Sequence, residues 1–290
     1  MESPESPLFQ EMEDGRSKTG IAGVLMRGWP FIRKGAGKVG LAWLFGWSKL
    51  FGRVSNGYGQ EDGMAKYTAS VEKRFQSPGP QPNGLQAADD GLWVIDQVNL
   101  KVHKLDWDSG EVLNEFDTET EHSSGITLGD DAVWITSTYQ LEVVKIDTKD
   151  GTTLQRFPDP GAGLISGRES MADARQTGSH GIEYRDGKVY VAGPPTQKIH
   201  IMDAATWEEV GQFATGGLRV HGIGWGENGM LWVSDTSAGT VLLMDPEQDG
   251  RVYDVFRVDE PDEVHGMTVR SNGEIWYCDA GTRDIGILNR

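Results

Sequence analysis

The stretch HGIGWGENGMLWVSD at residues 221–235 decides the fold, because it returns as HGMTVRSNGEIWYCD at residues 265–279. Each copy begins with a Gly and an aliphatic residue and carries a Trp ten residues after that Gly. The Gly–aliphatic pair occurs five times, with spacings of 41, 56, 41 and 44 residues: Gly84-Leu85, Gly125-Ile126, Gly181-Ile182, Gly222-Ile223 and Gly266-Met267. Self-similarity at a period near 40 residues indicates a repeat architecture.

Two further landmarks accompany each Gly. An aromatic residue follows nine or ten positions later, at Trp93, Trp134, Tyr190, Trp232 and Trp276. A Phe closes an alternating segment, at Phe75, Phe116, Phe157, Phe213 and Phe256. Period-2 runs such as KIHIMD, separated by Asp-Gly, Asn-Gly and Ser-Gly dipeptides, predict short antiparallel strands. Each unit is therefore predicted to contain four strands, with the Gly on the first, the aromatic residue on the second and the Phe on the fourth.

An all-β fold of the β-propeller type follows from these units. A four-stranded unit of this length cannot bury its own faces, so it stacks on its neighbours around a ring. The landmarks favour five blades; a sixth would have to come from residues 19–70, which contain none of them. The repeat starts with a lone fourth strand at residues 71–75 and stops after a third strand at residues 284–289. We expect the N-terminal strand to complete the last blade and close the ring.

The bulk composition limits the classes of function. The 290 residues carry 27 Lys and Arg against 44 Asp and Glu, a net charge of −17, which disfavours nucleic-acid binding. The single cysteine, Cys278, excludes an internal disulfide. The N-terminal MESPESPLFQEMEDG does not have the pattern of a secretory signal, and residues 39–47 are too short an apolar stretch for a spanning helix. A cytoplasmic protein is expected.

Residues 1–66 are predicted to form an extension before the propeller of residues 67–290. Residues 19–60 contain six basic residues and no acidic one, and residues 1–18 sum to −3, which leaves −20 for residues 61–290. The segment at residues 37–53, GKVGLAWLFGWSKLFGR, fits a helix with cations on one side and Trp, Leu and Phe on the other. We expect this helix to pack on the acidic propeller. Contact of residues 19–53 with a membrane surface is the alternative.

The candidate site follows from the antiparallel pairing of the first two strands of each unit. The first strand starts where the second ends, so both positions lie at one end of the channel. The starts are Asn83, Ser124, His180, His221 and His265, and the ends include Asp96, Asp235 and Asp279. The irregular spacing of 56 inserts 15 residues after Phe157, and this connection carries Arg168, Glu169 and Arg175. Long connections in a regular scaffold are often functional. We expect Asn83, Asp96, His122, Arg168, Glu169 and Arg175 to contact a bound small molecule.

Histidine in three successive units points to chemistry. Imidazoles suit a divalent cation, whose predicted ligands are His180, His221, His265, Asp235 and Asp279; the identity of the metal is open. The histidines also suit general acid–base catalysis without metal. A purely structural role, with His hydrogen-bonded to a turn and Asp capping it, is the competing interpretation. That role predicts the same residue in the first two units, where Asn and Ser stand instead.

The motifs PNGL, SHGI, VHGI and VHGM, followed by LWVID, LWVSD and TRDIGILN, resemble streptogramin B lyases and NHL-type propellers over residues 71–290. The resemblance implies a lyase that opens a lactone by elimination with a divalent cation, with His221 or His265 as the general base. The chain differs in having Asp235 and Asp279 where the lyase strands end in Glu, in its long insertion and in its smaller number of blades.

The sequence therefore predicts a metal-assisted lyase or hydrolase of small molecules, with His180, His221 and His265 as catalytic residues at the mouth of the channel. The alternative is a non-catalytic propeller that binds a ligand or protein with the same face, since a fold does not fix a function.

Overall fold

Short β-strands make up the part of the chain that the structure, a computed structural model, describes: residues 68–165, 174–259 and 263–290. The chain divides into two units, Met1–Gly57 and Tyr58–Arg290, and the described residues belong to the second. The predicted basic helix at residues 37–53 lies outside the described residues. No helix in the described ranges is long and apolar enough to cross a membrane.

Three four-stranded sheets follow one another along the chain. In each, all pairs are antiparallel and neighbours in sequence are neighbours in the sheet. The first contains β2 (Pro82–Ala88), β3 (Gly91–Asp96), β4 (Lys101–Leu105) and β5 (Val112–Asp117). The second contains β6 (Ser123–Gly129), β7 (Ala132–Ser137), β8 (Glu142–Asp147) and β9 (Thr153–Pro158). The third contains β10 (Ile182–Arg185), β11 (Lys188–Gly193), β12 (Lys198–Asp203) and β13 (Glu209–Ala214).

The remaining strands form one eight-stranded sheet with two halves. One half contains β14 (Val220–Trp225), β15 (Leu231–Asp235), β16 (Thr240–Asp245) and β17 (Arg251–Val258), with the short 3-10 turns η2 (Glu227–Gly229) and η3 (Pro246–Gln248) in its connections. The other contains β18 (Met267–Val269), β19 (Ile275–Cys278), β20 (Asp284–Asn289) and β1 (Thr68–Gln76). Two parallel pairs between β1 and β17 join the halves, Thr68 with Arg257 and Ala69 with Val258.

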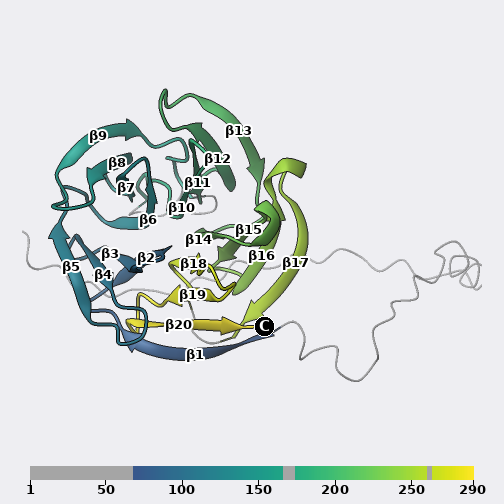
Figure 1. The fold of residues 1–290 in the computed structure, drawn as a ribbon. Helices are drawn as coiled ribbons and strands as arrows, with labels where there is room; N and C mark the ends of the chain where they lie inside the picture. Colours follow the sequence, from purple (N-terminus) through teal and green to yellow (C-terminus); the bar gives the residue numbers. More distant parts are fainter. Residues whose placement is uncertain (1–67, 166–173, 260–262) are drawn as a thin grey trace, which may run out of the picture. The chain divides into compact units, whose positions relative to one another are not determined.

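The N-terminal strand completes the sheet of C-terminal strands, as the sequence predicts. β1 runs antiparallel to β20 from the pair Ser70–Asn289 to the pair Gln76–Asp284. Phe75 of β1 packs on Trp276 of β19, with ring centroids 6.0 Å apart, in the place that the Phe of the fourth strand takes in the other units. The two ends of the described chain are therefore held in one sheet (Figure 1).

The innermost strands β2, β6, β10, β14 and β18 contact one another in cyclic order, and β18 returns to β2. Figure 1 shows them at the centre, with the fourth strands outside. A Cβ on Gly125 would lie 2.1 Å from the carbonyl oxygen of His180, and one on Gly181 would lie 2.0 Å from that of His221. The landmark glycine recurs because neighbouring inner strands approach too closely for a side chain.

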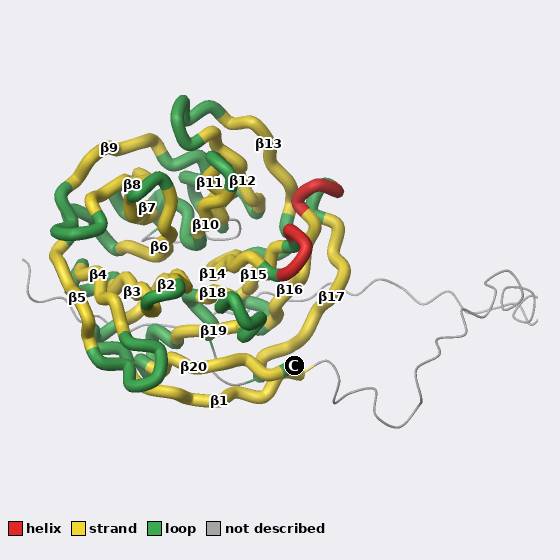
Figure 2. The backbone as a smooth tube through the Cα atoms, viewed as in Figure 1, coloured by secondary structure: helices red, strands yellow, loops and turns green. Residues whose placement is uncertain are grey.

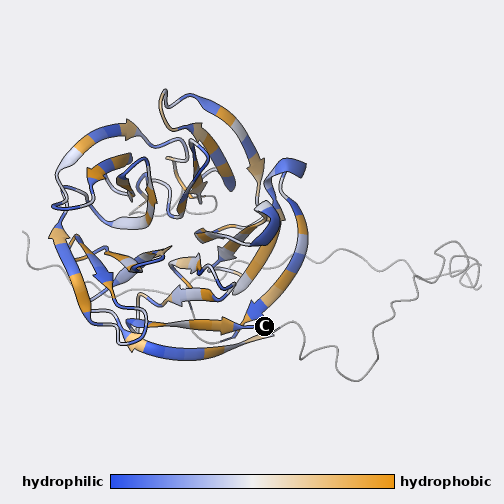
Figure 3. Ribbon diagram, viewed as in Figure 1, coloured by the Kyte–Doolittle hydropathy of each residue, from blue (hydrophilic) through white to orange (hydrophobic). Residues whose placement is uncertain are grey.

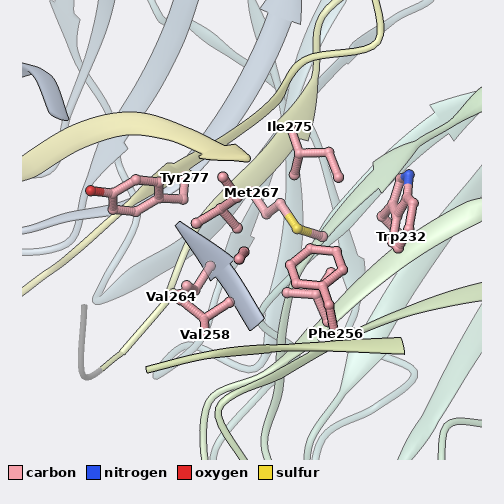
Figure 4. Packing of buried hydrophobic residues seen from close by; sticks show 10 residues of the cluster. Trp232, Phe256, Val258, Val264, Met267, Ile275 and Tyr277 are labelled. Atoms are coloured by element: carbon pink, nitrogen blue, oxygen red, sulfur yellow. The ribbon is translucent and has the colours of Figure 1, made fainter. Parts of the chain in front are cut away.

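The hydrophobic core lies between neighbouring sheets. One cluster combines Trp93 and Phe116 of the first sheet with Ile126 and Ile135 of the second. At the closing seam, Met267 of β18 packs with Trp232 of β15 and with Phe256 of β17 (Figure 4). The outer strands alternate hydrophobic and hydrophilic residues along their length (Figure 3), as expected of strands with one face buried. All five aromatic landmarks are buried and belong to this core.

Tight loops join successive strands (Figure 2). The β10–β11 hairpin turns at Asp186 and Gly187, whose φ angles are 51° and 73°. Positive φ at both central residues is what a type I′ hairpin requires, and it explains the Asp-Gly pair there. The connection between β9 and β10 is much longer than these turns, and it leads to the start of an inner strand.

Candidate functional site

The first two strands of each sheet place their start and end at the same edge, as the sequence predicts. The register pairs Pro82 with Asp96, Ser123 with Ser137 and Val220 with Asp235. In the third sheet the His180 amide donates to the Ala192 carbonyl at 2.8 Å. We call this edge of the ring the mouth; it contains the residues that precede the landmark glycines, Asn83, Ser124, His180, His221 and His265.

Three histidines meet at the mouth. The ring centroids of His180 and His221 are 4.1 Å apart and those of His221 and His265 are 4.9 Å apart, with the rings edge to face in both pairs. His180 Nδ1 lies 2.9 Å from His221 Nε2, so one of these nitrogens donates a hydrogen bond to the other. Such a bond needs one N–H and one lone pair. The sequence prediction that these side chains converge is confirmed.

Burial lowers the pKa of all three imidazoles. Burial lowers the pKa of His180 to about 3, and the positive charge of Arg219 adds to the effect. Burial also lowers the pKa of His221 well below its usual value, with His180 and His265 nearby. The pKa of His265 is lowered by burial as well, although the carboxylate of Glu263 opposes the shift. A neutral imidazole carries one free lone pair and can accept a proton.

A carboxylate links His265 to an arginine. Glu263 Oε2 lies 3.0 Å from His265 Nε2, and Arg219 Nη1 donates to Glu263 Oε1 at 3.2 Å. The Glu263 carboxylate therefore contacts both the His265 imidazole and the Arg219 guanidinium. His265 Nδ1 is buried and has no hydrogen-bond partner among the described residues.

A cavity of about 310 Å³ opens beside His180. It is lined by His122, Thr138, Tyr139, Leu164, Ile165, Ala174, Arg175, Thr177, His180 and Arg219. His122 stacks on Tyr139 with centroids 3.9 Å apart, and the Arg175 guanidinium lies 3.4 Å from the centroid of the Tyr139 ring. Burial lowers the pKa of His122, and Arg175 lowers it further. No Asp or Glu is among these described lining residues.

The space between the inner strands is narrow at the landmark glycines. The space between the landmark glycines and their aliphatic neighbours is only about 10 Å³, lined among others by Gly84, Gly125, Gly181, Gly222 and Gly266. A volume of that order holds about one water molecule.

The residues predicted to bind a small molecule separate into three groups. His122 and Arg175 line the cavity. Arg168 and Glu169 lie outside the described residues. Asn83 is buried and its amide donates to Gln97 Oε1, away from the cavity lining.

Asp96, also predicted to contact the ligand, is fully buried and serves the backbone instead. Its carboxylate accepts hydrogen bonds from the amides of Gln81, Val98 and Asn99 at 2.5, 2.9 and 2.9 Å. Asp96 therefore caps the turn that follows β3.

The predicted metal ligands do not fit a metal centre. Asp235 accepts hydrogen bonds from the amides of Leu218 at 2.8 Å and Ser237 at 2.8 Å, and Asp279 accepts from those of Gly281 at 2.6 Å and Thr282 at 2.8 Å. Both carboxylates thus cap turns, the competing interpretation of the sequence. In the ranges that the structure describes, no group of three or more His, Cys, Asp or Glu side chains is placed to hold a metal ion.

Sequence reasoning passed over Arg219, Glu263 and Tyr139. Arg219 and Glu263 stand two residues before the histidines of their strands, as His122 stands two before Ser124. Alternate residues of an extended segment point to the same side. The signal for the charged groups of the mouth was the position three residues before each landmark glycine. It is occupied by Gln81, His122, Gly178, Arg219 and Glu263.

No protein-family model matches the sequence, and neither does any curated protein. Solved structures do match the fold. Glutaminyl cyclase from Myxococcus xanthus is 12% identical, with a TM-score of 0.61 over 77% of this chain and 96% of its own. A streptogramin B lyase is 17% identical, with a TM-score of 0.48 over 76% of this chain and 97% of its own. Virginiamycin B lyase from Staphylococcus aureus is 20% identical, with a TM-score of 0.46 over 72% of this chain and 66% of its own.

At these identities the likeness concerns the fold alone. The chain is a β-propeller, the class that its repeat and its resemblance to the streptogramin B lyases predict. Its reaction and ligand have to be argued from its own residues.

Proposed function

We propose that the 20 described strands form a five-bladed ring and that the mouth is the active site of a lyase or hydrolase of small molecules. The observation that carries this proposal is the neutral His180, which lines a cavity and is hydrogen-bonded to a second neutral histidine. A structural histidine needs neither a cavity nor a histidine partner.

His180 is the proposed general base. In the tautomer in which its Nδ1–H donates to His221, Nε2 carries a lone pair and has no protein partner among the described residues. That nitrogen is free to take a proton from a carbon beside a carbonyl group, which leads to elimination, or from a water molecule, which leads to hydrolysis. With a pKa of about 3 it is a weak base, so the negative charge of a bound substrate has to raise that pKa for the step to run at neutral pH. The imidazolium formed then returns the proton to the leaving group.

His221 and His265 are proposed to position and support His180 rather than to touch the substrate, because neither lines the cavity. His221 is 3% exposed and accepts or donates the bond that fixes the His180 ring. The Glu263 carboxylate holds His265 beside His221. Removing the support of a catalytic imidazole lowers catalysis without removing the base itself.

No step of this proposal passes through a metal ion, because the carboxylates offered as ligands cap turns. The metal assistance predicted from the sequence remains a prediction. Likewise, a propeller that only binds a ligand at the mouth is the second candidate function, since a cavity with arginines and aromatic rings also suits binding without turnover.

The test is product formation from a panel of small lactones, esters, amides and glutaminyl peptides, before and after dialysis against a chelator. We expect saturable turnover of at least one ester or lactone, unchanged by the chelator. Loss of turnover that an added divalent cation restores supports the metal-assisted form. Binding of panel members without any product identifies the mouth as a binding site and contradicts the enzyme.

A further inference from the structure

The described residues that line the cavity carry positive charge, in a strongly acidic protein. Residues 61–290 sum to −20, yet the charged side chains that line the cavity in the described ranges are Arg175 and Arg219. An arginine keeps its charge at all ordinary pH values. The neutral His180 and His122 add hydrogen-bonding groups but no compensating negative charge.

We propose that the cavity selects small organic carboxylates, and that Arg175 and Arg219 bind the carboxylate group. This proposal depends on the proposed function in one respect, that the bound carboxylate is the substrate on which His180 acts. It names the substrate class of that site: a molecule with a carboxylate at one end and the reacting carbonyl or ether group at the other.

Among the described residues, no carboxylate neutralises Arg175. The Cζ atom of its guanidinium lies over the Tyr139 ring at 3.4 Å from the centroid, a contact that holds the group in place without neutralising it. No ion pair joins Arg175 to a carboxylate of the described residues. A guanidinium held in this way presents its N–H edge as a rigid donor, which matches the two oxygens of a carboxylate.

Arg219 is partly compensated but keeps donors for a ligand. Its one hydrogen bond to a described side chain goes from Nη1 to Glu263, and a guanidinium has five N–H donors. Glu263 in turn is shared with His265 and is not a lining residue of the cavity. Arg219 is therefore a lining cation whose counter-ion, Glu263, is not itself a lining residue.

The size of the cavity limits the ligand. At about 310 Å³ it is at the small end of ligand pockets, which typically measure about 300–1,000 Å³. The stacked rings of His122 and Tyr139 and the side chains of Leu164 and Ile165 offer apolar contact. A compact carboxylate with an apolar body fits this combination better than a peptide segment or a hydrated inorganic ion.

The experiment compares three benzene derivatives of similar size and different charge: benzoate, benzamide and benzylammonium. Binding to the full chain is measured by ligand-observed NMR at low ionic strength. We expect benzoate to bind more tightly than benzamide, and benzylammonium to bind least. The affinity for benzoate should fall with added salt.

The variants are Arg175→Gln and Arg219→Gln, with Arg185→Gln as the matched control. Arg185 also lies on an aromatic ring, 4.6 Å from the centroid of Trp225, but does not line the cavity. Loss of one charge-assisted hydrogen-bond pair should weaken benzoate binding by about 10- to 100-fold in each cavity variant and leave the control unchanged. Arg219→Lys, which keeps the charge, should recover part of the loss.

Equal binding of benzoate and benzamide would overturn the inference, as would cavity variants that bind benzoate as the wild type does, or no benzoate binding at all. Melting temperatures identify a variant that fails to fold, and Arg175→Gln, which removes no ion pair with a described residue, then decides the matter. If benzoate binds as expected but no ester or lactone that carries a free carboxylate reacts, the carboxylate site stands and the proposed catalysis fails. If turnover is found and the Arg variants leave KM unchanged, the proposed catalysis stands and the carboxylate site fails.

Discussion

The residue before the landmark glycine has a different environment in each inner strand. His180 lines the cavity, His221 is buried between two other histidines, and His265 is paired with Glu263. The sequence was enough to predict that the three converge, because one position of a repeat occupies one place in each unit. It was not enough to predict which of them faces the cavity, because that depends on neighbours such as Arg219 that come from the next strands.

The aspartates show the limit of reading a site from residue type. Asp235 and Asp279 stand at strand ends beside the histidines, where a ligand and a turn cap have the same sequence position. The hydrogen bonds from backbone amides decide in favour of the cap. Asp96 stands at the same position and caps its own turn. An equivalent role in three units indicates a property of the repeat rather than of the site.

Glu183 on β10 is a buried acid that sequence reasoning overlooked. Its side chain is 2% exposed, and its partner among the described residues is the Thr127 hydroxyl, which donates to Oε2 at 3.5 Å. Burial without a cation raises the pKa of Glu183 well above its usual value. The protonated form of Glu183 is therefore favoured more strongly in the folded protein than in the unfolded chain.

Glu183→Gln should stabilise the protein, and the gain should grow with pH. An acid whose pKa is raised by folding contributes a stability that is lost as pH rises above the unfolded pKa of about 4.3, by up to about 1.4 kcal/mol per pH unit. The amide has no such proton, so the variant escapes the loss. Urea unfolding at about pH 5 and about pH 8 measures the difference, with the exposed Glu208→Gln as the control. A variant less stable than the wild type at the higher pH would show that Glu183 is ionised in the folded state.

The long connection between β9 and β10 frames the cavity at the level of elements. Gly163 and Thr177 form an isolated bridge through reciprocal backbone hydrogen bonds of 2.8 and 3.0 Å. Asp159 accepts from the Ser179 amide at 2.5 Å and the Gly161 amide at 2.8 Å, which ties the base of the insertion. The spacing of 56 residues predicted that this connection serves the site, and Leu164 and Arg175 from it do line the cavity.

β1 is the element on which closure of the ring depends. It pairs with β20 along its length and with β17 at its first residues, so its removal exposes both strands. Deleting residues 1–76 should cause aggregation, because unpaired edges join other chains. Deleting residues 1–66 leaves β1 intact and should keep a monomer. Size-exclusion chromatography and thermal melts of the two truncations separate these outcomes; an unchanged melting temperature after the longer deletion would show that β1 does not hold the ring.

The ring as a whole was predictable because its determinants are local and repeated. The landmark glycine marks the contact between inner strands, the aromatic residue and Phe mark the core between sheets, and the lone strand at residues 71–75 marks the closure. The site was predictable only in position. Its charges and its cavity depend on side chains from strands far apart in sequence, such as Tyr139 and Arg219, which have no common motif.

At the scale of the whole molecule, the central claim is that chemistry takes place at the mouth through His180. The measurement that tests it most directly is turnover per folded molecule of His180→Ala, with His103→Ala as the control for a buried histidine on an outer strand, β4. Removing a general base should lower kcat by about 10²- to 10⁴-fold. The loss of one hydrogen bond, about 1 kcal/mol, should shift Tm by only a few degrees. Turnover per folded His180→Ala molecule equal to that of the wild type would contradict the account.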